Sequence, residues 1–268
     1  MNKEILKRKK ALIEFIPTVN KFLTQTQNKT NLKISKKSTI DLVTEADKGS
    51  EKRITGFLKK NFPEDSLLGE EGSAYDGKNQ WKWIIDPLDG TTNYAHGLPL
   101  YAVSIGLENR ETGLIEMGLI SIPSLGDLYH AIRNGGAFKN NKKIHVTNTD
   151  LLINSLMCTG FPYTPENEMP VLLNRLKSFL LKGRGLRRTG AAALDLAWLA
   201  EGRFDIFWED MLNPWDLAAG FLLIEEAGGK VTDFKGNTFN PYISNILATN
   251  GILHEEAVKV LKASSKKK

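Results

Sequence analysis

The sequence predicts a layered α/β fold in which helices alternate with sheets. Short apolar or alternating segments, typical of strands, recur in both halves of the chain. Segments with apolar residues at helical spacing lie between them, and this alternation is characteristic of layered α/β proteins. No long linker, low-complexity segment or solenoid repeat interrupts the order. A chain of 268 residues can bury a sizeable core, as one large unit or as two fused halves.

The first half is expected to open with two helices and to continue into a sheet. Apolar spacing predicts a long helix over 3–28, kinked or broken near Pro17, and a second helix over 50–60. Asp47 opens the second helix, where it can serve simply as an N-cap. Strands are expected at 66–72, 101–107, 115–121 and 127–132, the last three as an antiparallel meander.

The second half alternates between strands and helices. Strands are expected at 155–160 and 203–208, and helices at 171–181, 190–201 and 217–227. Gly202 and Gly228 provide stop signals for the last two helices. A boundary near residue 145 divides the chain into an N-terminal α+β half, 1–145, and a C-terminal α/β half, 146–268.

The composition excludes several classes of protein. Hydrophobic residues make up 41% of the chain, and the longest apolar candidate, 217–224, is far shorter than the roughly 18 residues of a membrane span. The basic start is followed by an apolar segment that Glu14 and Pro17 interrupt, so we expect an amphipathic helix and no signal peptide. The single cysteine, Cys158, is expected to be a buried structural thiol, which fits a cytoplasmic location.

The net charge of +5 lies largely in the two ends of the chain, which are typical solvated tails. The segment 182–188, Lys-Gly-Arg-Gly-Leu-Arg-Arg, is a better candidate for contact with an anion. It lacks interleaved aromatic residues and matches no nucleic-acid-binding motif. A solvated or subunit-contact face is therefore favoured over RNA or DNA binding.

The stretch 83–93, Trp-Ile-Ile-Asp-Pro-Leu-Asp-Gly-Thr-Thr-Asn, carries the strongest chemical signal. A buried strand is expected to end at Asp86, because the following proline removes a backbone donor. Asp86, the Leu88 carbonyl and Asp89 then place three oxygen ligands within four residues. Gly90 and the next two threonines offer backbone amides that suit an anion, with a threonine as helix cap. Taken alone, the stretch also fits an ordinary Asp/Gly turn.

Further carboxylates fit the same site. Glu70 follows a short apolar strand, as Asp86 does, and α/β sheets bind ligands outside their strand ends. Asp216 begins a helix, where a carboxylate is favoured by about 0.3 to 1 kcal/mol and needs no function to explain it. Oxygen ligands suit Mg²⁺, whereas the four histidines show no paired spacing that would suit zinc. Clustered carboxylates repel by about 4 kcal/mol per pair at 4 Å, which a cation relieves.

The stretch 83–93, followed later by Trp-Asp-Leu-Ala-Ala-Gly and Glu-Ala-Gly-Gly, resembles the inositol monophosphatase family of Mg²⁺-dependent, lithium-inhibited phosphatases. The resemblance extends from about Lys36 to Gly229. It implies an αβαβα sandwich, shared with fructose-1,6-bisphosphatases, whose two halves form one compact catalytic unit. It also implies a homodimer and two or three Mg²⁺ ions per active site.

The resemblance assigns roles residue by residue. The matching metal ligands are Glu70, Asp86, the Leu88 carbonyl, Asp89 and Asp216, of which only Asp216 lies in the second half. The pair that activates the attacking water matches Asp47 and Thr91, with Glu70 as a further catalytic residue. The phosphate site matches Gly90, Thr91 and Thr92, the polyol side matches Ala192 and Glu209, and a mobile loop matches Lys36 and Asp41.

The reaction implied is direct in-line attack of a metal-activated water on a phosphate monoester. Inositol 1-phosphate is the favoured substrate, since His-Gly-Leu-Pro at 96–99 is similar to bacterial members near the inositol branch. Histidinol phosphate, fructose 1,6-bisphosphate and NADP remain alternatives. Thr-Asn-Tyr at 92–94 argues against the adenosine-phosphate branch, which has Lys-Glu-Phe there. An added role in binding the transcription machinery or ribosomal RNA assembly factors is a further alternative.

Overall fold

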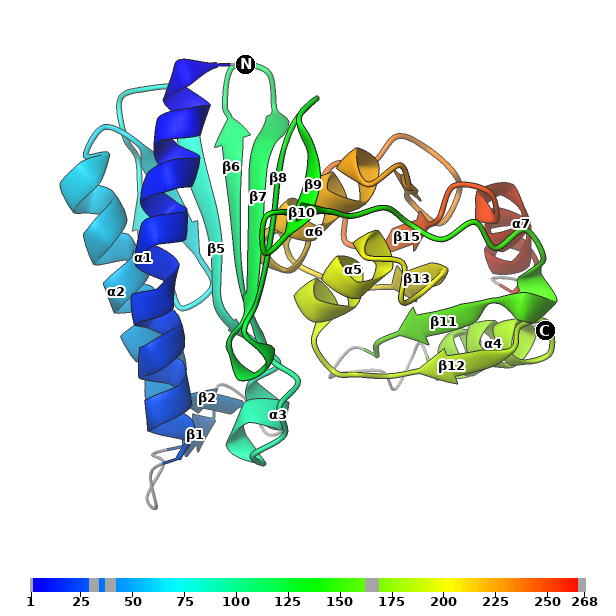
Figure 1. The fold of residues 1–268 in the computed structure, drawn as a ribbon. Coiled ribbons are helices and arrows are strands. Elements are labelled where there is room, and N and C mark those ends of the chain that lie inside the picture. The colour runs from blue at the N-terminus through cyan, green and yellow to red at the C-terminus, as the bar shows by residue number, and fades with distance from the viewer. Residues whose placement is uncertain (1, 29–33, 37–41, 162–168, 265–268) are drawn as a thin grey trace.

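The computed structural model describes residues 2–28, 34–36, 42–161 and 169–264 (Figure 1). In these residues, helices and sheets form five layers in the order α, β, α, β, α, which confirms the layered α/β fold. A large sheet and a small sheet face each other across a middle pair of helices. One further pair of helices covers the outer face of each sheet.

The first helix pair and the large sheet come from the first part of the chain. Helices α1 (Lys3–Gln27) and α2 (Glu45–Asn61) pack on one face of a sheet with the order β10-β9-β8-β7-β6-β5-β3-β4. All neighbouring strands are antiparallel except the parallel pair β3 and β5. The strands are β3 (Ser66–Gly69), β4 (Ala74–Tyr75), β5 (Trp81–Asp89), β6 (Ala102–Asn109), β7 (Leu114–Ile122), β8 (Asp127–Ile132), β9 (Gly136–Lys139) and β10 (Lys142–Lys143).

Short elements lie beside this sheet. An antiparallel pair of strands, β1 (Ile34–Lys36) and β2 (Leu42–Thr44), precedes α2. Helix α3 (Thr91–Ala95) follows β5, and single 3₁₀ turns occur at η1 (Pro123–Leu125) and η2 (Leu152–Asn154). The β6, β7 and β8 strands confirm the predicted antiparallel meander.

The remaining layers come from the later part of the chain. Helices α5 (Ala192–Ala200) and α6 (Pro214–Glu226) form the middle layer, and α4 (Met169–Leu180) and α7 (His254–Ser264) the outer one. The small sheet has the order β12-β11-β13-β15-β14. Its strands are β11 (Leu156–Thr159), β12 (Gly185–Arg187), β13 (Ile206–Glu209), β14 (Lys230–Thr232) and β15 (Ile246–Thr249). The division of the chain at residue 145 stays a prediction.

Three apolar clusters among the described residues hold the layers together. One lies between α1, α2 and the large sheet, and another between the small sheet and the outer helices. The third encloses α5 and α6 between the two sheets, which explains why both helices are apolar on nearly every side. Gly118 of β7 permits this packing, because a Cβ there would lie 2.6 Å from the Ala219 carbonyl oxygen of α6.

Several predicted element boundaries are wrong. Helix α1 continues through Pro17, whose exposed position spares the buried face formed by Ile16 and Val19. Helix α2 begins at Glu45, because Thr44 accepts a hydrogen bond from the Ala46 amide and acts as its N-cap. Asp47 is therefore the third residue of the helix and completes a capping box with Thr44.

The motif stretch also differs from its prediction. Strand β5 continues to Asp89, with an irregular register between Asp86 and Asp89, although a strand end was expected at Asp86. Gly90, in the left-handed region with φ 87°, is the N-cap of α3, so no threonine caps that helix. Cys158 is buried on β11, as predicted. Within the described residues, no helix combines the length and apolar composition that crossing a bilayer requires.

Candidate active site

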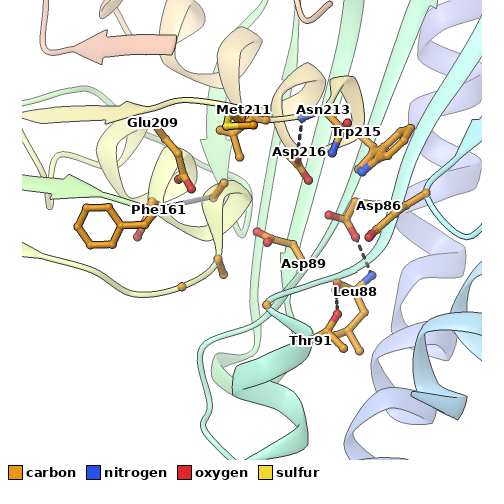
Figure 2. Close-up of a pocket in the computed structure, with 18 of the residues that line it drawn as sticks. Asp86, Leu88, Asp89, Thr91, Phe161, Glu209, Met211, Asn213, Trp215 and Asp216 are labelled. Atoms are coloured by element: carbon orange, nitrogen blue, oxygen red, sulfur yellow. Dashed lines mark hydrogen bonds between the residues drawn. The ribbon is translucent and has the colours of Figure 1, made fainter. Parts of the chain in front are cut away.

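A hollow of about 300 Å³ lies where the end of β5 meets the starts of α5 and α6 (Figure 2). It is lined from both sides of the middle helical layer, so residues far apart in the sequence share it. Most of the predicted site residues line it: Glu70, Asp86, Leu88, Asp89, Gly90, Thr91, Ala192, Glu209 and Asp216. Asp47 lies behind Thr91, and Thr92 does not line the hollow. Lys36 ends β1, and Asp41 falls outside the described residues.

Strand β5 delivers two carboxylates to the same side. In a regular strand, residues three apart point to opposite faces. The register shift between Asp86 and Asp89 removes this alternation, and both side chains line the hollow. The Leu88 amide donates a 2.9 Å hydrogen bond to Asp86 Oδ1, which fixes the bend. The irregular strand end therefore creates the paired carboxylates.

Asp89 also acts as a cap for a helix from the other half of the chain. Helix α5 follows Ala191, which offers no side-chain cap of its own. The Ala193 amide instead donates a 2.7 Å hydrogen bond to Asp89 Oδ2. The carboxylate thus satisfies a free amide at the start of α5 and faces the hollow at the same time.

Asp216 enters the hollow from the start of α6. The Asn213 amide donates to Asp216 Oδ2 at 2.7 Å, in a reciprocal capping box. Ser104 of β6 donates to the carbonyl oxygen of Trp215 at 3.0 Å and ties the helix start to the large sheet. The predicted position at a helix start is confirmed, and the side chain lines the hollow as well.

Glu70 follows β3, the parallel neighbour of β5. Gly69 pairs with Ile85, so Glu70, just past the end of β3, lies next to Asp86 of β5. The Glu70 amide donates to the carbonyl oxygen of Ile85 at 3.1 Å. The two carboxylates contact each other closely enough for Glu70 to raise the pKa of Asp86.

The carboxylates in the hollow repel one another. Burial, followed by repulsion from Glu70, Asp89 and Asp216, raises the pKa of Asp86 well above its usual value. Burial also raises the pKa of Asp89 to about 7 and that of Asp216 to about 8, with repulsion from neighbouring carboxylates adding to both. The ionised forms are therefore unfavourable together unless a cation neutralises them.

The donor set fits a hard divalent cation such as Mg²⁺. All of the candidate ligands are oxygens, from four carboxylates and the Leu88 carbonyl. Among the described residues, no three His, Cys, Asp or Glu side chains lie close enough together to hold a metal ion in the arrangement seen here.

Beside the carboxylates lies a hydroxyl–carboxylate pair. Thr91 Oγ1 donates to Asp47 Oδ1 at 2.8 Å and also lies 3.2 Å from the Leu88 carbonyl oxygen. The Thr44 hydroxyl and amide both donate to Asp47 Oδ2, at 2.6 and 2.7 Å. Burial raises the pKa of Asp47, and these hydrogen bonds partly offset it. Asp47 is thus held in one orientation behind Thr91, which faces the hollow.

The opposite wall carries Glu209 and Ala192, as the resemblance implied. The Glu209 carboxylate lies against Gly160, where a Cβ would be 2.0 Å from its Oε1 atom. Its pKa is raised well above the usual value, first by burial and then by the charges of nearby Asp195 and Asp216. Glycine at position 160 leaves the space that this carboxylate needs.

Sequence reasoning missed three charged residues that line the hollow, namely Arg188, Asp195 and Asp210. Arg188 lines the hollow and lowers the pKa of Glu209, although it was assigned to a solvated or subunit-contact face. Asp195 lines the hollow from α5, where Thr189 donates to it at 2.6 Å. A lone acid in the otherwise apolar helix 192–200 was the available signal, because a buried carboxylate without a role is costly.

Comparison with known proteins gives a family match over nearly the whole chain. The model of the inositol monophosphatase family matches residues 4–266. An inositol-1-monophosphatase of Mesorhizobium japonicum is 41% identical over 233 residues, covering 87% of each chain. A putative Nus factor SuhB of Neisseria meningitidis is 41% identical, covering 87% of this chain and 88% of its own. The chloroplastic phosphatase IMPL1 of Arabidopsis thaliana is also 41% identical, and the match spans 84% of this chain and 62% of that longer protein.

Solved structures agree with this match. The extragenic suppressor protein suhB of Bartonella henselae has a TM-score of 0.91 and 38% identity, covering 96% of this chain and 98% of that chain. A structure titled as an IMPase/NADP phosphatase complexed with Mg²⁺ and phosphate has a TM-score of 0.85 and 25% identity, covering 97% of each chain.

Proposed function

Because this chain belongs to the inositol monophosphatase family, we propose that it hydrolyses inositol 1-phosphate to myo-inositol and phosphate, with Mg²⁺ as its cofactor. The observation that carries the proposal is the convergence of four carboxylates and the Asp47–Thr91 pair on one hollow. Phosphate monoester hydrolysis is so slow in water that a catalyst must lower the barrier by about 20 kcal/mol or more. Cations bound by the carboxylate cluster would supply the positive charge that lowers this barrier.

Two or three Mg²⁺ ions would be held by the carboxylates and the Leu88 carbonyl. The groups proposed as ligands are Glu70, Asp86, Leu88, Asp89 and Asp216. Bound Mg²⁺ supplies positive charge that offsets the phosphate and lowers the pKa of water. The Mg²⁺ and phosphate named in the similar IMPase/NADP phosphatase structure support this choice. Inhibition by lithium stays a prediction of the family resemblance.

Thr91 and Asp47 are proposed to take the proton of the attacking water. Thr91 Oγ1 gives its own proton to the hydrogen bond with Asp47, so its lone pairs are free to accept from a water in the hollow. Asp47 can then accept the proton that Thr91 passes on, since Thr44 holds the carboxylate in place. Gly90 and the amides after it are proposed to contact the phosphate, without a covalent phosphoenzyme.

The opposite wall is proposed to select the alcohol part of the substrate. Glu209 and Asp195 are carboxyl groups that can hydrogen-bond the hydroxyls of a polyol, and Arg188 lies beside them. Ala192 borders the same space. The alternatives are histidinol phosphate, fructose 1,6-bisphosphate and NADP, which offer an imidazole, a second phosphate or a nucleotide to this wall.

The deciding experiment is phosphate release from these four substrates with Mg²⁺ or with a chelator. We expect Mg²⁺-dependent turnover that is highest with inositol 1-phosphate. Turnover confined to another substrate would replace inositol phosphate but keep the chemistry. The absence of turnover on all four at saturating Mg²⁺ would contradict the catalytic proposal.

A second candidate function is binding to a partner in transcription. Relatives of this chain carry the name Nus factor SuhB. Arg184 and Arg187 are exposed at β12, which forms one edge of the small sheet. Replacing both with glutamine tests this function, because neither residue lines the hollow. Arg188 must stay unchanged in that test, since it lines the hollow and its loss would confound a partner effect with a catalytic one.

We also propose a homodimer and a cytoplasmic location. Four apolar side chains expose more than half of their surface: Leu151, Ile153, Leu180 and Leu181. Arg184, just after the second pair, donates a hydrogen bond to Asn154, just after the first pair. A second copy of the chain would cover these side chains. Light scattering of the wild type and of Leu181→Glu checks this proposal, with a monomeric wild type as the contradicting result.

A further inference from the structure

Helix α2 presents three polar side chains along one face, and each contacts a different segment of the active site. Asp47, Ser50 and Glu51 are spaced i, i+3 and i+4, so they lie on the same side of the helix. All three are buried. Asp47 contacts Thr91, as described above, while the other two reach the segments that carry the proposed cation ligands.

Ser50 holds the irregular end of β5. Its hydroxyl donates a 2.8 Å hydrogen bond to the carbonyl oxygen of Pro87, which lies between Asp86 and Leu88. The regular pairing of β5 with β6 is interrupted between Asp86 and Asp89. Ser50 therefore supplies a partner to the backbone at the place where the sheet does not, and it fixes the bend that carries three oxygen ligands.

Glu51 holds the turn after Glu70. Its two carboxylate oxygens accept from the amides of Glu71, at 2.9 Å, and Ser73, at 3.0 Å. Gly69 makes room for this contact, because a Cβ there would lie 2.5 Å from Glu51 Oε2. The carboxylate is only 3% exposed, so these amides replace water as its partners. The backbone on the far side of Glu70 is thereby attached to α2.

We propose that Ser50 and Glu51 are positioning residues that set the separation between Glu70 and the Asp86–Leu88 bend for cation binding. Helix α2 can serve as the common support, because Ile54 and Leu58, which continue the same helix face, are fully buried in the core. This inference rests on the proposed Mg²⁺-dependent function. It adds that the cation affinity of the hollow depends on two side chains that do not line it.

The test is Mg²⁺ affinity, measured by calorimetry without substrate and by the Mg²⁺ concentration that gives half-maximal turnover. In Glu51→Gln, a side-chain NH₂ group replaces one carboxylate oxygen and faces a backbone N–H, so one hydrogen bond is lost. We expect the affinity for Mg²⁺ to fall at least about tenfold. Excess Mg²⁺ should restore kcat to within about threefold, because the variant keeps every proposed ligand. Ser50→Ala should lower the Mg²⁺ affinity about fivefold, which corresponds to the loss of one hydrogen bond of about 1 kcal/mol.

Thr55→Val is the matched control. It removes another buried hydroxyl of α2, which donates to the Glu51 carbonyl oxygen within the helix. We expect this variant to lose stability and to keep the wild-type Mg²⁺ affinity. Gly69→Ala provides an independent change, because the added methyl group displaces the Glu51 carboxylate, and it should weaken Mg²⁺ binding as Glu51→Gln does.

The outcomes separate the two proposals. If the wild type binds Mg²⁺ and turns over substrate, and Glu51→Gln and Ser50→Ala lose only thermal stability with unchanged affinity, the positioning role is wrong. If Glu51→Gln does not fold, an unchanged affinity in Ser50→Ala alone overturns the inference. Wild-type protein without Mg²⁺-dependent turnover would instead contradict the proposed function itself.

Discussion

Asp89 at the end of β5 accepts a hydrogen bond from the backbone amide of Ala193 at the start of α5, over 2.7 Å. One carboxylate oxygen therefore caps a helix of the middle layer, while the side chain also lines the hollow. The residue joins the large sheet to the middle helices, and its charge belongs to the proposed cation site. These two roles can be separated by substitution.

Asp89→Asn should abolish most of the activity and spare the fold. Asparagine keeps an oxygen for the Ala193 amide but removes the charge from the carboxylate cluster. We expect kcat to fall at least about 100-fold at saturating Mg²⁺, with little change in Tm. Asp89→Ala, the comparison variant, should also lose about 1 kcal/mol of stability with the cap. Near-normal turnover by Asp89→Asn would remove Asp89 from the proposed ligands.

Thr91→Val should slow the chemical step without changing the affinity for the cation. The variant removes the hydroxyl that donates to Asp47 and is proposed to accept the proton of water. We expect kcat to fall about 100-fold or more, with calorimetric Mg²⁺ affinity near that of the wild type. Thr55→Val is the control, since the Thr55 hydroxyl donates within α2 and does not line the hollow. Equal losses in the two variants would contradict the proposed role of Thr91.

Stability without metal should depend on pH in a direction set by the carboxylates. The folded pKa of Asp89, about 7, and of Asp216, about 8, exceed the unfolded values near 4. The stability that these groups contribute is present below pH 4 and is lost as pH rises through their folded pKa values. Mg²⁺ should therefore raise Tm more at pH 8.5 than at pH 6, as measured by calorimetry against a chelated sample. A shift in Tm that is equal at both pH values, or larger at pH 6, would contradict this expectation.

A different pH effect is expected from His254. Its ring nitrogens lie 2.9 Å from the hydroxyls of Thr232 and Thr249, and burial lowers its pKa to about 4. Its contribution to stability is present above the unfolded pKa of about 6.5 and is lost as pH falls towards 4. His254→Gln should flatten the dependence of unfolding free energy on pH in this window. An unchanged pH dependence of the unfolding free energy in His254→Gln would contradict this expectation.

Much of the candidate site could be predicted because many of its residues lie close together in the sequence. The Asp-Pro-Leu-Asp-Gly-Thr motif places its oxygens close together through covalent connectivity alone, and the structure brings them into one hollow. The positions of Glu70 and Asp216 followed from a strand end and a helix start. Their roles as ligands remain proposals, which the substitutions above test.

What could not be predicted depends on contacts between distant segments. Arg188 looked like part of a basic surface segment until the fold placed it beside Glu209. The start of α2 was placed too late because Thr44 and Asp47 cap it through hydrogen bonds that the apolar spacing does not reveal. Likewise, the register shift that turns Asp86 and Asp89 to one side arises from the pairing of β5 with β6.

Gly106 and Gly118 allow α6 to pack closely on the large sheet. A Cβ at Gly106 would meet Ala218 of that helix, and a Cβ at Gly118 would meet Ala219. Asp216 stands at the start of the same helix. One methyl group added on the sheet would move the whole helix outward, and the carboxylate with it. Substitution of either glycine would therefore change the affinity of the proposed cation site, although neither residue borders the hollow.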